Sequence, residues 1–257
     1  MENEVNLVIE WIKNYVESVG ANGVVIGNSG GKDSAVVTGL CTKALGNDKV
    51  LTIAMPCSSI QEDIADAKLV ADAFDVQMLT MDLTNTYSTL TSSIEQEIKT
   101  SIPNYSSINI KPRLRMTTLY AIAQAKGFLV AGTGNLCESF VGYTTKWGDN
   151  ASDFNPLAEF SVREVLEIGK IIGVPSKILE KAPNDGLGSG SDEDKLGVKY
   201  SQIEDYIKNG TCGNAEADLK IEKLHKASQH KRDKIPVYKR INFWWIFFKN
   251  LTYNKIL

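Results

Sequence analysis

The fold is decided by residues 23–34, which read GVVIGNSGGKDS. The apolar, β-branched run Gly23–Gly27 predicts a buried strand, and residues 33–45 after it predict a helix. The glycines between them let the backbone turn tightly and approach a ligand. The first turn of the helix adds free N–H groups and a partial positive charge. We therefore predict a phosphate-binding turn, with hydroxyl donors at Ser29 and Ser34 and a cation at Lys32.

Two familiar nucleotide-binding motifs do not fit this turn. A Walker loop needs Ser or Thr after its lysine and a glycine further upstream, but here Asp33 follows Lys32 and Ile26 holds the upstream position. The dinucleotide fingerprint GxGxxG fails because Ser29 stands where its second glycine belongs. What remains, SGGxDS, resembles the loop of ATPases that split ATP into AMP and pyrophosphate. The alternative is a glycine-rich turn that binds no ligand.

The acid inside this turn, Asp33, indicates a metal ion. A carboxylate repels phosphate unless a cation lies between them, and Mg²⁺ suits that position. Open parallel sheets bind ligands beyond the carboxyl ends of their strands, where the strand order reverses. A predicted strand at Phe128–Ala131 would bring Thr133 and Glu138 to that edge. We predict that Asp33 and Glu138 share a Mg²⁺ bound to ATP; the alternative for Glu138 is a solvated charge near a helix start.

Short β-branched runs alternate with longer helical ones along the first half of the chain. Strands are expected at Gly23–Gly27, 50–55, 76–82 and Phe128–Ala131, and helices at 33–45, 61–74, 86–101 and 111–126. Helix-length connections between buried strands require crossovers, which predicts a Rossmann-like α/β fold: a parallel sheet with helices on both faces. Residues 132–153 are expected to be irregular. Residues 161–173 are expected to be helical, with a capping box made by Ser161 and Glu164.

The composition describes a soluble globular protein of one domain over residues 1–257. Of its 257 residues 43% are hydrophobic and 23% charged, and the net charge of -3 suggests no nucleic-acid partner. The four cysteines stand apart without a metal or disulfide pattern, so reduced thiols in a cytoplasmic enzyme are expected. The acidic N-terminus is unlike a signal peptide, and the apolar stretch 243–248 is too short to span a membrane.

Residues 182–197 read APNDGLGSGSDEDKLG, with four glycines, several acids and few apolar side chains. They form either a disordered surface loop or a mobile lid over an active site. As a lid closed on its substrates, the segment would bring Asn184 and Ser191 towards phosphate and Glu193 towards the metal. The end of the chain is expected to be a helical tail.

Together with the loop, four later segments resemble the NAD synthetase family, whose fold is of the adenine nucleotide alpha-hydrolase type. The loop alone would also suit GMP synthetase, asparagine synthetase or tRNA-modifying enzymes. The later segments are NIKPRLRM at 109–116, GTGNLCE at 132–138 followed by GYTTKWGD at 142–149 and Asp153, SDEDKLG at 191–197, and QHKR at 229–232. The resemblance covers nearly the whole chain.

The resemblance implies a role for each matching position. ATP would be bound by Gly27, Asn28, Ser29, Gly30, Gly31, Lys32, Asp33, Ser34 and Thr133, and Mg²⁺ by Asp33 and Glu138. The dinucleotide deamido-NAD would be bound by Arg113, Lys146, Asp153, His230 and Lys231. In this family the dinucleotide pocket is completed across a homodimer interface, so a homodimer is expected.

These assignments have ordinary alternatives. Arg113 and Arg115 are about 200° apart around a helix, so one of them belongs to the surface. Residues 225–234 would also suit a solvated basic face, and Lys146 a surface lysine. The family usually has a lysine where this chain has Val162, and a threonine or serine near Asn184. Either Arg163 substitutes for that lysine, or one phosphate contact is missing.

The reaction that the resemblance implies is ATP-dependent amidation of deamido-NAD by ammonia, which gives NAD, AMP and pyrophosphate through an adenylated intermediate. Lys32 and Asp33 would assist the loss of pyrophosphate, and Asp149 is a candidate acceptor for a proton from ammonium. Glutamine-dependent relatives carry an amidase domain, for which there is no room before residue 27, so free ammonia is expected. The rival functions are a tRNA thiolase, whose cysteine pairs and basic surface are not evident, and a nucleotide sensor without catalysis.

Overall fold

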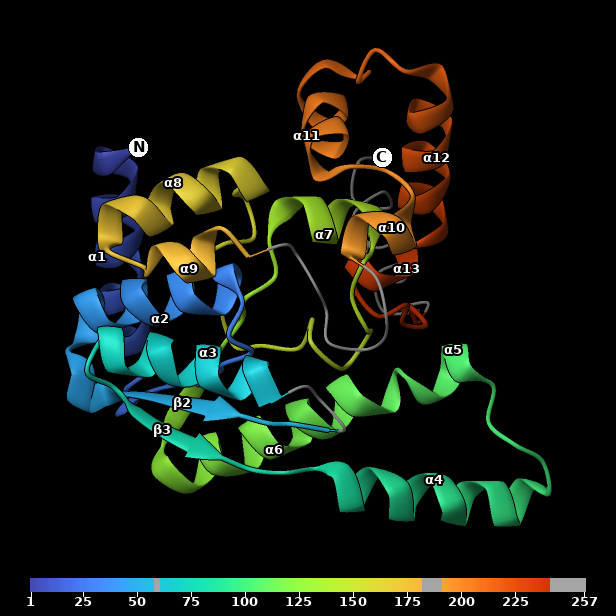
Figure 1. Ribbon diagram of the computed structural model, residues 1–257, viewed down its shortest axis with the longest axis horizontal. Helices are drawn as coiled ribbons and strands as arrows, with labels where there is room; N and C mark the ends of the chain where they lie inside the picture. The colour runs from blue at the N-terminus through green and yellow to red at the C-terminus, as the bar shows by residue number, and fades with distance from the viewer. Residues whose placement is uncertain (58–60, 182–190, 241–257) are drawn as a thin grey trace, which may run out of the picture.

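The computed structural model describes residues 1–57, 61–181 and 191–240 (Figure 1). Its centre is a four-stranded parallel sheet in the order β3-β2-β1-β4. The strands are β1 (Gly23–Gly27), β2 (Val50–Ala54), β3 (Gln77–Thr80) and β4 (Phe128–Ala131). The register places Val24 of β1 beside Val50 of β2 and Leu129 of β4. The predicted parallel sheet is confirmed, and β2 and β3 are slightly shorter than expected.

The strand order reverses between β1 and β4. The chain runs outward from β1 through β2 to β3, and then returns to the other side of β1 to form β4. The crossovers leave a crevice beyond the carboxyl ends of these two central strands, which is where open parallel sheets bind ligands. The expectation that β1 and β4 flank the switch point is therefore confirmed.

Helices cover both faces of the sheet, as the sequence predicts. One face is covered by α1 (Glu2–Ser18), α2 (Lys32–Leu45), α3 (Gln61–Ala73), α8 (Val162–Ile172) and α9 (Ser176–Leu179), and the other by α4 (Thr84–Ile98) and α6 (Ile110–Lys126) (Figure 1). The alternation of side chains along β1 explains both layers. Val24 and Ile26 pack against the first group of helices, whereas Val25 packs with Leu51 and Ile53 against the second.

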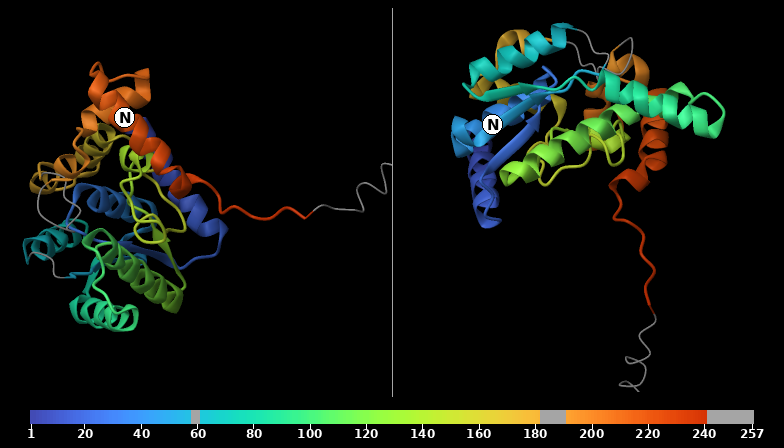
Figure 2. Two further views of the ribbon diagram at one scale, coloured as in Figure 1. Left: turned by 90° about the vertical axis from the view of Figure 1, so that its right-hand side faces the viewer. Right: turned by 90° about the horizontal axis from the view of Figure 1, so that it is seen from below.

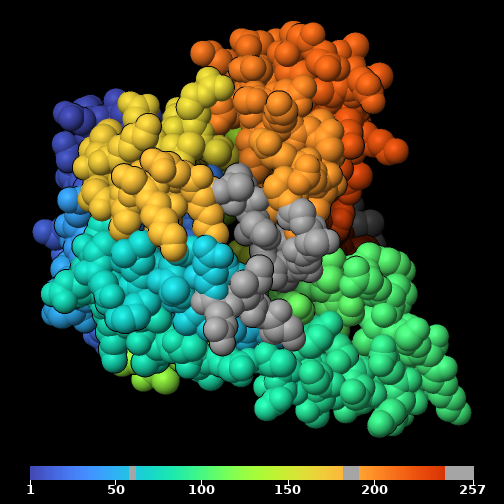
Figure 3. Space-filling view, viewed as in Figure 1, coloured from blue at the N-terminus to red at the C-terminus, as the bar shows by residue number. Residues whose placement is uncertain are grey.

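A third apolar cluster joins the later helices beside the sheet. It contains residues of α7 (Leu136–Val141), α8, α10 (Asp192–Leu196), α11 (Tyr200–Asn209) and α12 (Ala215–Ala227). The short elements are η1 (Asn47–Lys49), α5 (Asn104–Ser107) and α13 (Gln229–Arg232). Figure 3 shows α4 and α5 projecting from the body, and Figure 2 shows residues 233–240 leading away from it.

Several local predictions can be compared with this architecture. The capping box of α8 is confirmed, because the Ser161 hydroxyl accepts from the Glu164 amide and the Glu164 carboxylate accepts from the Ser161 amide. The region 132–153 is not wholly irregular, since it contains α7. All four cysteines are free thiols, as expected. Within the described ranges, no helix has the length and apolar character needed to cross a bilayer. Residues 182–190 of the expected lid, and the tail from 241 onwards, lie outside those ranges.

Candidate active site

A cavity of about 600 Å³ lies beyond the carboxyl ends of β1 and β4. The predicted pyrophosphate loop forms one wall, through Gly27, Asn28, Ser29, Gly31, Lys32, Asp33 and Ser34. Thr133, Glu138, Asp149 and Lys231 line it from other segments. Gly30 does not line the cavity, because it lies against α3. The sheet topology thus gathers residues that are more than a hundred positions apart in the sequence.

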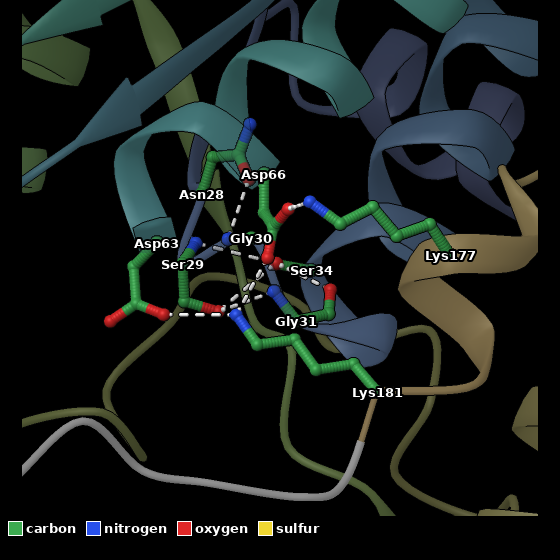
Figure 4. Close-up of polar contacts among 9 residues, drawn as sticks. All are labelled: Asn28, Ser29, Gly30, Gly31, Ser34, Asp63, Asp66, Lys177 and Lys181. Atoms are coloured by element: carbon green, nitrogen blue, oxygen red, sulfur yellow. Dashed lines mark hydrogen bonds and ion pairs between the residues drawn. The ribbon is translucent and has the colours of Figure 1, made fainter. Parts of the chain in front are cut away.

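The loop is held by hydrogen bonds within itself and to α3. Asn28 donates through its side-chain amide to the Ala67 carbonyl, at 2.8 Å, and accepts from the Gly30 amide, at 3.1 Å. The Ser34 hydroxyl donates to the Gly31 carbonyl, at 3.0 Å, and its oxygen lies 3.2 Å from that of Ser29 (Figure 4). Helix α2 begins directly after this turn, so its first amides face the cavity edge without intrahelical acceptors.

The two carboxylates predicted from topology are joined through one asparagine. Asp33 forms an ion pair with Lys32, at 2.9 Å, and accepts from the Asn135 side-chain amide, at 3.0 Å. The backbone amide of Asn135 donates to the Glu138 carboxylate, also at 3.0 Å. Glu138 thus caps α7, as in the alternative stated above, but it is partly buried, and the charge of Asp33 acts on it.

The electrostatics of this group leave negative charge to be balanced. Burial, with the nearby charge of Asp33, raises the pKa of Glu138 to about 8. Burial alone would lower the pKa of Lys32, but Asp33, Glu138 and Asp192 together raise it, so this ammonium stays charged. One lysine therefore faces several acids, and a further cation would stabilise the ionised form of Glu138. Asp33 and Glu138 are the carboxylates placed to hold it.

Comparison with known proteins identifies the family of the chain. A family model described as NAD synthase matches residues 4–236. The chain belongs to the NAD synthase family. Its members are ATP-using ligases, and this chain is one of them. It is 39% identical to the NH(3)-dependent NAD(+) synthetase of Carboxydothermus hydrogenoformans, over 90% of this chain and 95% of that protein.

Solved structures share the fold of this chain. The NMN synthetase of Francisella tularensis superposes with a TM-score of 0.87 at 33% identity, over 93% of this chain and 98% of that one. The NH3-dependent NAD synthetase of Campylobacter jejuni superposes with a TM-score of 0.76 at 22% identity, with the same coverage. The second likeness concerns the fold alone, and it confirms the predicted adenine nucleotide alpha-hydrolase type of sheet.

The cavity also contains an acid, Asp149, and a base, Lys231, whose pKa values are shifted. Asp149 accepts from the Thr145 amide at 2.6 Å, and burial raises its pKa. Burial also lowers the pKa of Lys231, whose ammonium donates to the carbonyls of Gly142 and Thr144 at 2.7 and 2.6 Å. Both shifts move the pKa values towards neutrality, which makes it easier for each group to exchange a proton.

Four of the residues expected to bind deamido-NAD lie outside the cavity lining. The Arg113 guanidinium donates to the Lys146 carbonyl, and the Lys146 ammonium donates to the His230 carbonyl. Asp153 accepts from the amide of Val130 in β4, at 2.7 Å. Their part in dinucleotide binding stays a prediction. Structurally, they tie α6, α13 and the 142–153 segment to the edge of the sheet.

Other cavity residues were not among the predicted site residues. Arg115 lines the cavity while Arg113 does not, as their angular separation on α6 requires, and its guanidinium donates to the Met55 carbonyl. Asp192 lines the cavity, whereas Glu193 accepts from the Tyr200 amide. Lys181 and Arg232 also line the cavity. The angle between the two arginines was a usable sequence signal, and Asp192 lies in the matching segment 191–197 without an assigned role. No local pattern marked Lys181.

Val162 stands where the family usually has a lysine. Val162 is buried in the apolar cluster beside α7, and Arg163 forms an ion pair with Glu204 at 3.1 Å. Neither residue lines the cavity. Arg163 therefore does not substitute for the family's usual lysine in this structure, and any cation that replaces it must come from another segment.

Proposed function

We propose that this chain amidates deamido-NAD with ammonia and ATP, giving NAD, AMP and pyrophosphate. The observation that carries the proposal is the arrangement of Asp33, Lys32 and Glu138 around one cavity at the pyrophosphate loop. This arrangement fits a nucleoside triphosphate with a bound cation. It supplies the groups that stabilise the loss of pyrophosphate, namely loop amides, an ammonium and carboxylates that would bind a metal ion. The relatives named NH(3)-dependent NAD(+) synthetase support the choice of substrates.

The donor set fits Mg²⁺. Desolvation and the charge of Asp33 raise the pKa of the partly buried Glu138, and a divalent cation held by both carboxylates would offset these effects. In the part of the chain that the structure describes, no three His, Cys, Asp or Glu residues form a complete metal site. Two carboxylates, with phosphate oxygens and water completing the shell, are a common arrangement for Mg²⁺. When bound, this ion would neutralise phosphate charge.

The first chemical step transfers AMP to the substrate. An oxygen of the nicotinate carboxylate attacks the α-phosphorus of ATP, and the bond to the bridging oxygen breaks. Pyrophosphate leaves with that electron pair, while Lys32 and the amides at the start of α2 stabilise its charge. Alignment of the two substrates in one cavity contributes further, by roughly 7–11 kcal/mol in favourable cases.

The second step forms the amide. Ammonia attacks the acyl carbon of the mixed anhydride, and AMP leaves with the electrons of the broken carbon–oxygen bond. The nitrogen must lose protons, and Asp149 is the carboxylate that we assign as acceptor. Its raised pKa makes its carboxylate a stronger base than an ordinary aspartate.

The direct test is incubation of the purified chain with ATP, Mg²⁺, ammonium and deamido-NAD, followed by chromatography of the products. We expect NAD and AMP in equal amounts with ammonium, and no NAD when glutamine is the only nitrogen source. A control without chain measures any chemical amidation. Equal rates with ammonium and glutamine, in a preparation free of glutaminase, would contradict the assignment of ammonia as nitrogen donor.

A second candidate substrate is nicotinic acid mononucleotide. The likeness to the Francisella tularensis NMN synthetase favours it, because that protein shares 33% identity and nearly full coverage with this chain. The same adenylation and amidation would then yield NMN. A competition between equal concentrations of deamido-NAD and the mononucleotide decides between the candidates, since the ratio of products equals the ratio of kcat/KM values.

We also propose a homodimer whose interface contributes to substrate binding. Leu7 and Trp11 of α1 are 51% and 45% exposed, which is the kind of surface that a second copy covers. The exposed positions of Arg113 and Lys146 outside the cavity fit a pocket that a partner completes.

Leu7→Glu should convert the dimer into monomers, because it places a charge on that apolar face. The monomer should lose deamido-NAD binding but retain much of its ATP binding, measured by sedimentation velocity and calorimetry. Leu219→Glu, at another exposed leucine on α12, is the matched control and should remain dimeric. A wild-type chain that sediments as an active monomer would refute the proposal.

A further inference from the structure

A cluster of two lysines and two aspartates lies beside the pyrophosphate loop (Figure 4). The Lys181 ammonium lies 2.9 Å from Asp63 and 2.7 Å from Asp66, and the Lys177 ammonium lies 2.7 Å from the other oxygen of Asp66. The two acids belong to α3, and the two lysines to α9 and the residues just after it. No residue of this cluster has a role in the two steps given above.

The cluster is in contact with the loop through Gly30. A Cβ atom at Gly30 would lie 2.7 Å from the Asp63 carbonyl oxygen and 2.8 Å from the Asp66 Cβ. The loop and the acids that hold Lys181 are thus packed against each other. Lys181 and Asp63 also line the cavity together with Ser29 and Gly31 (Figure 4).

Lys181 lines the cavity and could leave its acids without leaving Asp66 unpaired, whereas Lys177 does not line the cavity. Asp66 is only 1% exposed, but it would keep Lys177 as a partner on its other oxygen. Asp63 is 29% exposed and can be solvated. Burial alone would raise the pKa of Asp66, but its hydrogen bonds to both lysines lower it. Burial alone would lower the pKa of Lys181, but its hydrogen bonds to Asp66 and Asp63 raise it. Both shifts favour the charged forms of Asp66 and Lys181.

A triphosphate at the loop would be stabilised by a cation besides Lys32. Lys32 is already paired with Asp33, Val162 is apolar, and Arg163 is paired with Glu204. ATP brings a triphosphate against this wall, and its β- and γ-phosphates become the leaving group when the α-phosphorus is attacked. A lysine beside the loop suits that group, because lysine binds phosphate as a flexible point charge.

We propose that Lys181 contacts the β- and γ-phosphates of ATP and the pyrophosphate that leaves, taking the place of the lysine absent at Val162. The inference rests on the proposed function. In the free protein Asp63 and Asp66 hold the ammonium beside the loop. On nucleotide binding it exchanges these carboxylates for phosphate oxygens, while Lys177 keeps Asp66 paired. Adenylation breaks the bond between the α-phosphorus and the bridging oxygen, and Lys181 stabilises the negative charge that pyrophosphate carries away.

The test compares Lys181→Met with Lys177→Met. Both variants remove one ion pair to Asp66, but only Lys181 lines the cavity. Binding of inorganic pyrophosphate with Mg²⁺, measured by calorimetry, should weaken by about 10- to 100-fold in Lys181→Met. It should change less than about threefold in Lys177→Met. AMP binding should stay unchanged in both, and Lys181→Arg should restore most of the pyrophosphate affinity.

Thermal unfolding separates this role from a structural one. If the cluster only clamps α3 to α9, the two methionine variants should lose similar pyrophosphate affinity and similar thermal stability, which would overturn the proposal. Unchanged pyrophosphate binding in Lys181→Met would do the same. Calorimetry measures binding and needs no turnover. A wild-type chain that binds pyrophosphate but makes neither NAD nor NMN would therefore contradict the proposed function and leave the role of Lys181 in binding untouched.

Discussion

Asp33→Asn should slow adenylation by about 10³-fold or more, because it removes one of the two carboxylates placed to hold a cation. The side chain keeps its volume, and its remaining oxygen can still accept from Asn135. The fold should therefore survive. What changes is charge: Lys32 loses its partner at 2.9 Å, and the loop loses the anion that makes a metal ion favourable there.

Single-turnover formation of AMP, measured over a range of magnesium concentrations, checks this expectation. Circular dichroism and thermal unfolding show whether the fold is kept. Asp72→Asn is the control, since this acid forms an exposed ion pair with Lys68 on α3 away from the cavity. It should change the rate by less than about twofold. An Asp33→Asn variant with full activity at ordinary magnesium would overturn the metal assignment.

Gly30→Ala should both destabilise the protein and remove nucleotide binding. The backbone φ of Gly30 is +73°, a conformation that costs L-residues about 1–2 kcal/mol. Its added Cβ would lie 2.7 Å from the Asp63 carbonyl and 2.9 Å from the Ala67 nitrogen, so the loop must move away from α3. We expect a loss of about 3 kcal/mol, which for a chain of this size lowers the Tm by about 6–12 °C.

Gly20→Ala separates the two causes. Gly20 has a similar φ of +69°, but nothing lies within 4 Å of an added Cβ. It should therefore lose only the conformational part, about 1–2 kcal/mol, and bind ATP normally. Calorimetry with a non-hydrolysable ATP analogue should show about 10²-fold weaker binding, or none, for Gly30→Ala alone. Equal effects of the two substitutions would show that contact between loop and α3 is unimportant.

The parts of the site that follow from local sequence were predicted well. The strand before Asn28, the tight turn and helix α2 are encoded by neighbouring residues, so their arrangement needs no long-range information. The same holds for the capping box at Ser161 and Glu164. The nearness of Asp33 and Glu138 was also predictable, although they are far apart in the chain. The rule that parallel strands end at a common edge is enough to bring them together.

Positions that depend on packing were not predictable in this way. The angle between Arg113 and Arg115 shows that only one can face a ligand, but the orientation of α6 on β1 and β4 decides that it is Arg115. Helix α7 was missed because its six residues are too few for a periodic pattern.

By itself, the sequence determined the α/β class, the strand–turn–helix that forms the predicted pyrophosphate loop, and the family. Each depends on neighbouring residues or on a general rule of strand topology. Only the tertiary structure decided which cations reach the cavity. Arg163 forms an ion pair with Glu204, and the Lys146 ammonium donates to the His230 carbonyl. Lys181, in contrast, lines the cavity beside the loop. A long cationic side chain is placed by whichever acceptors surround its end, and those acceptors come from distant segments whose approach only the packed core defines.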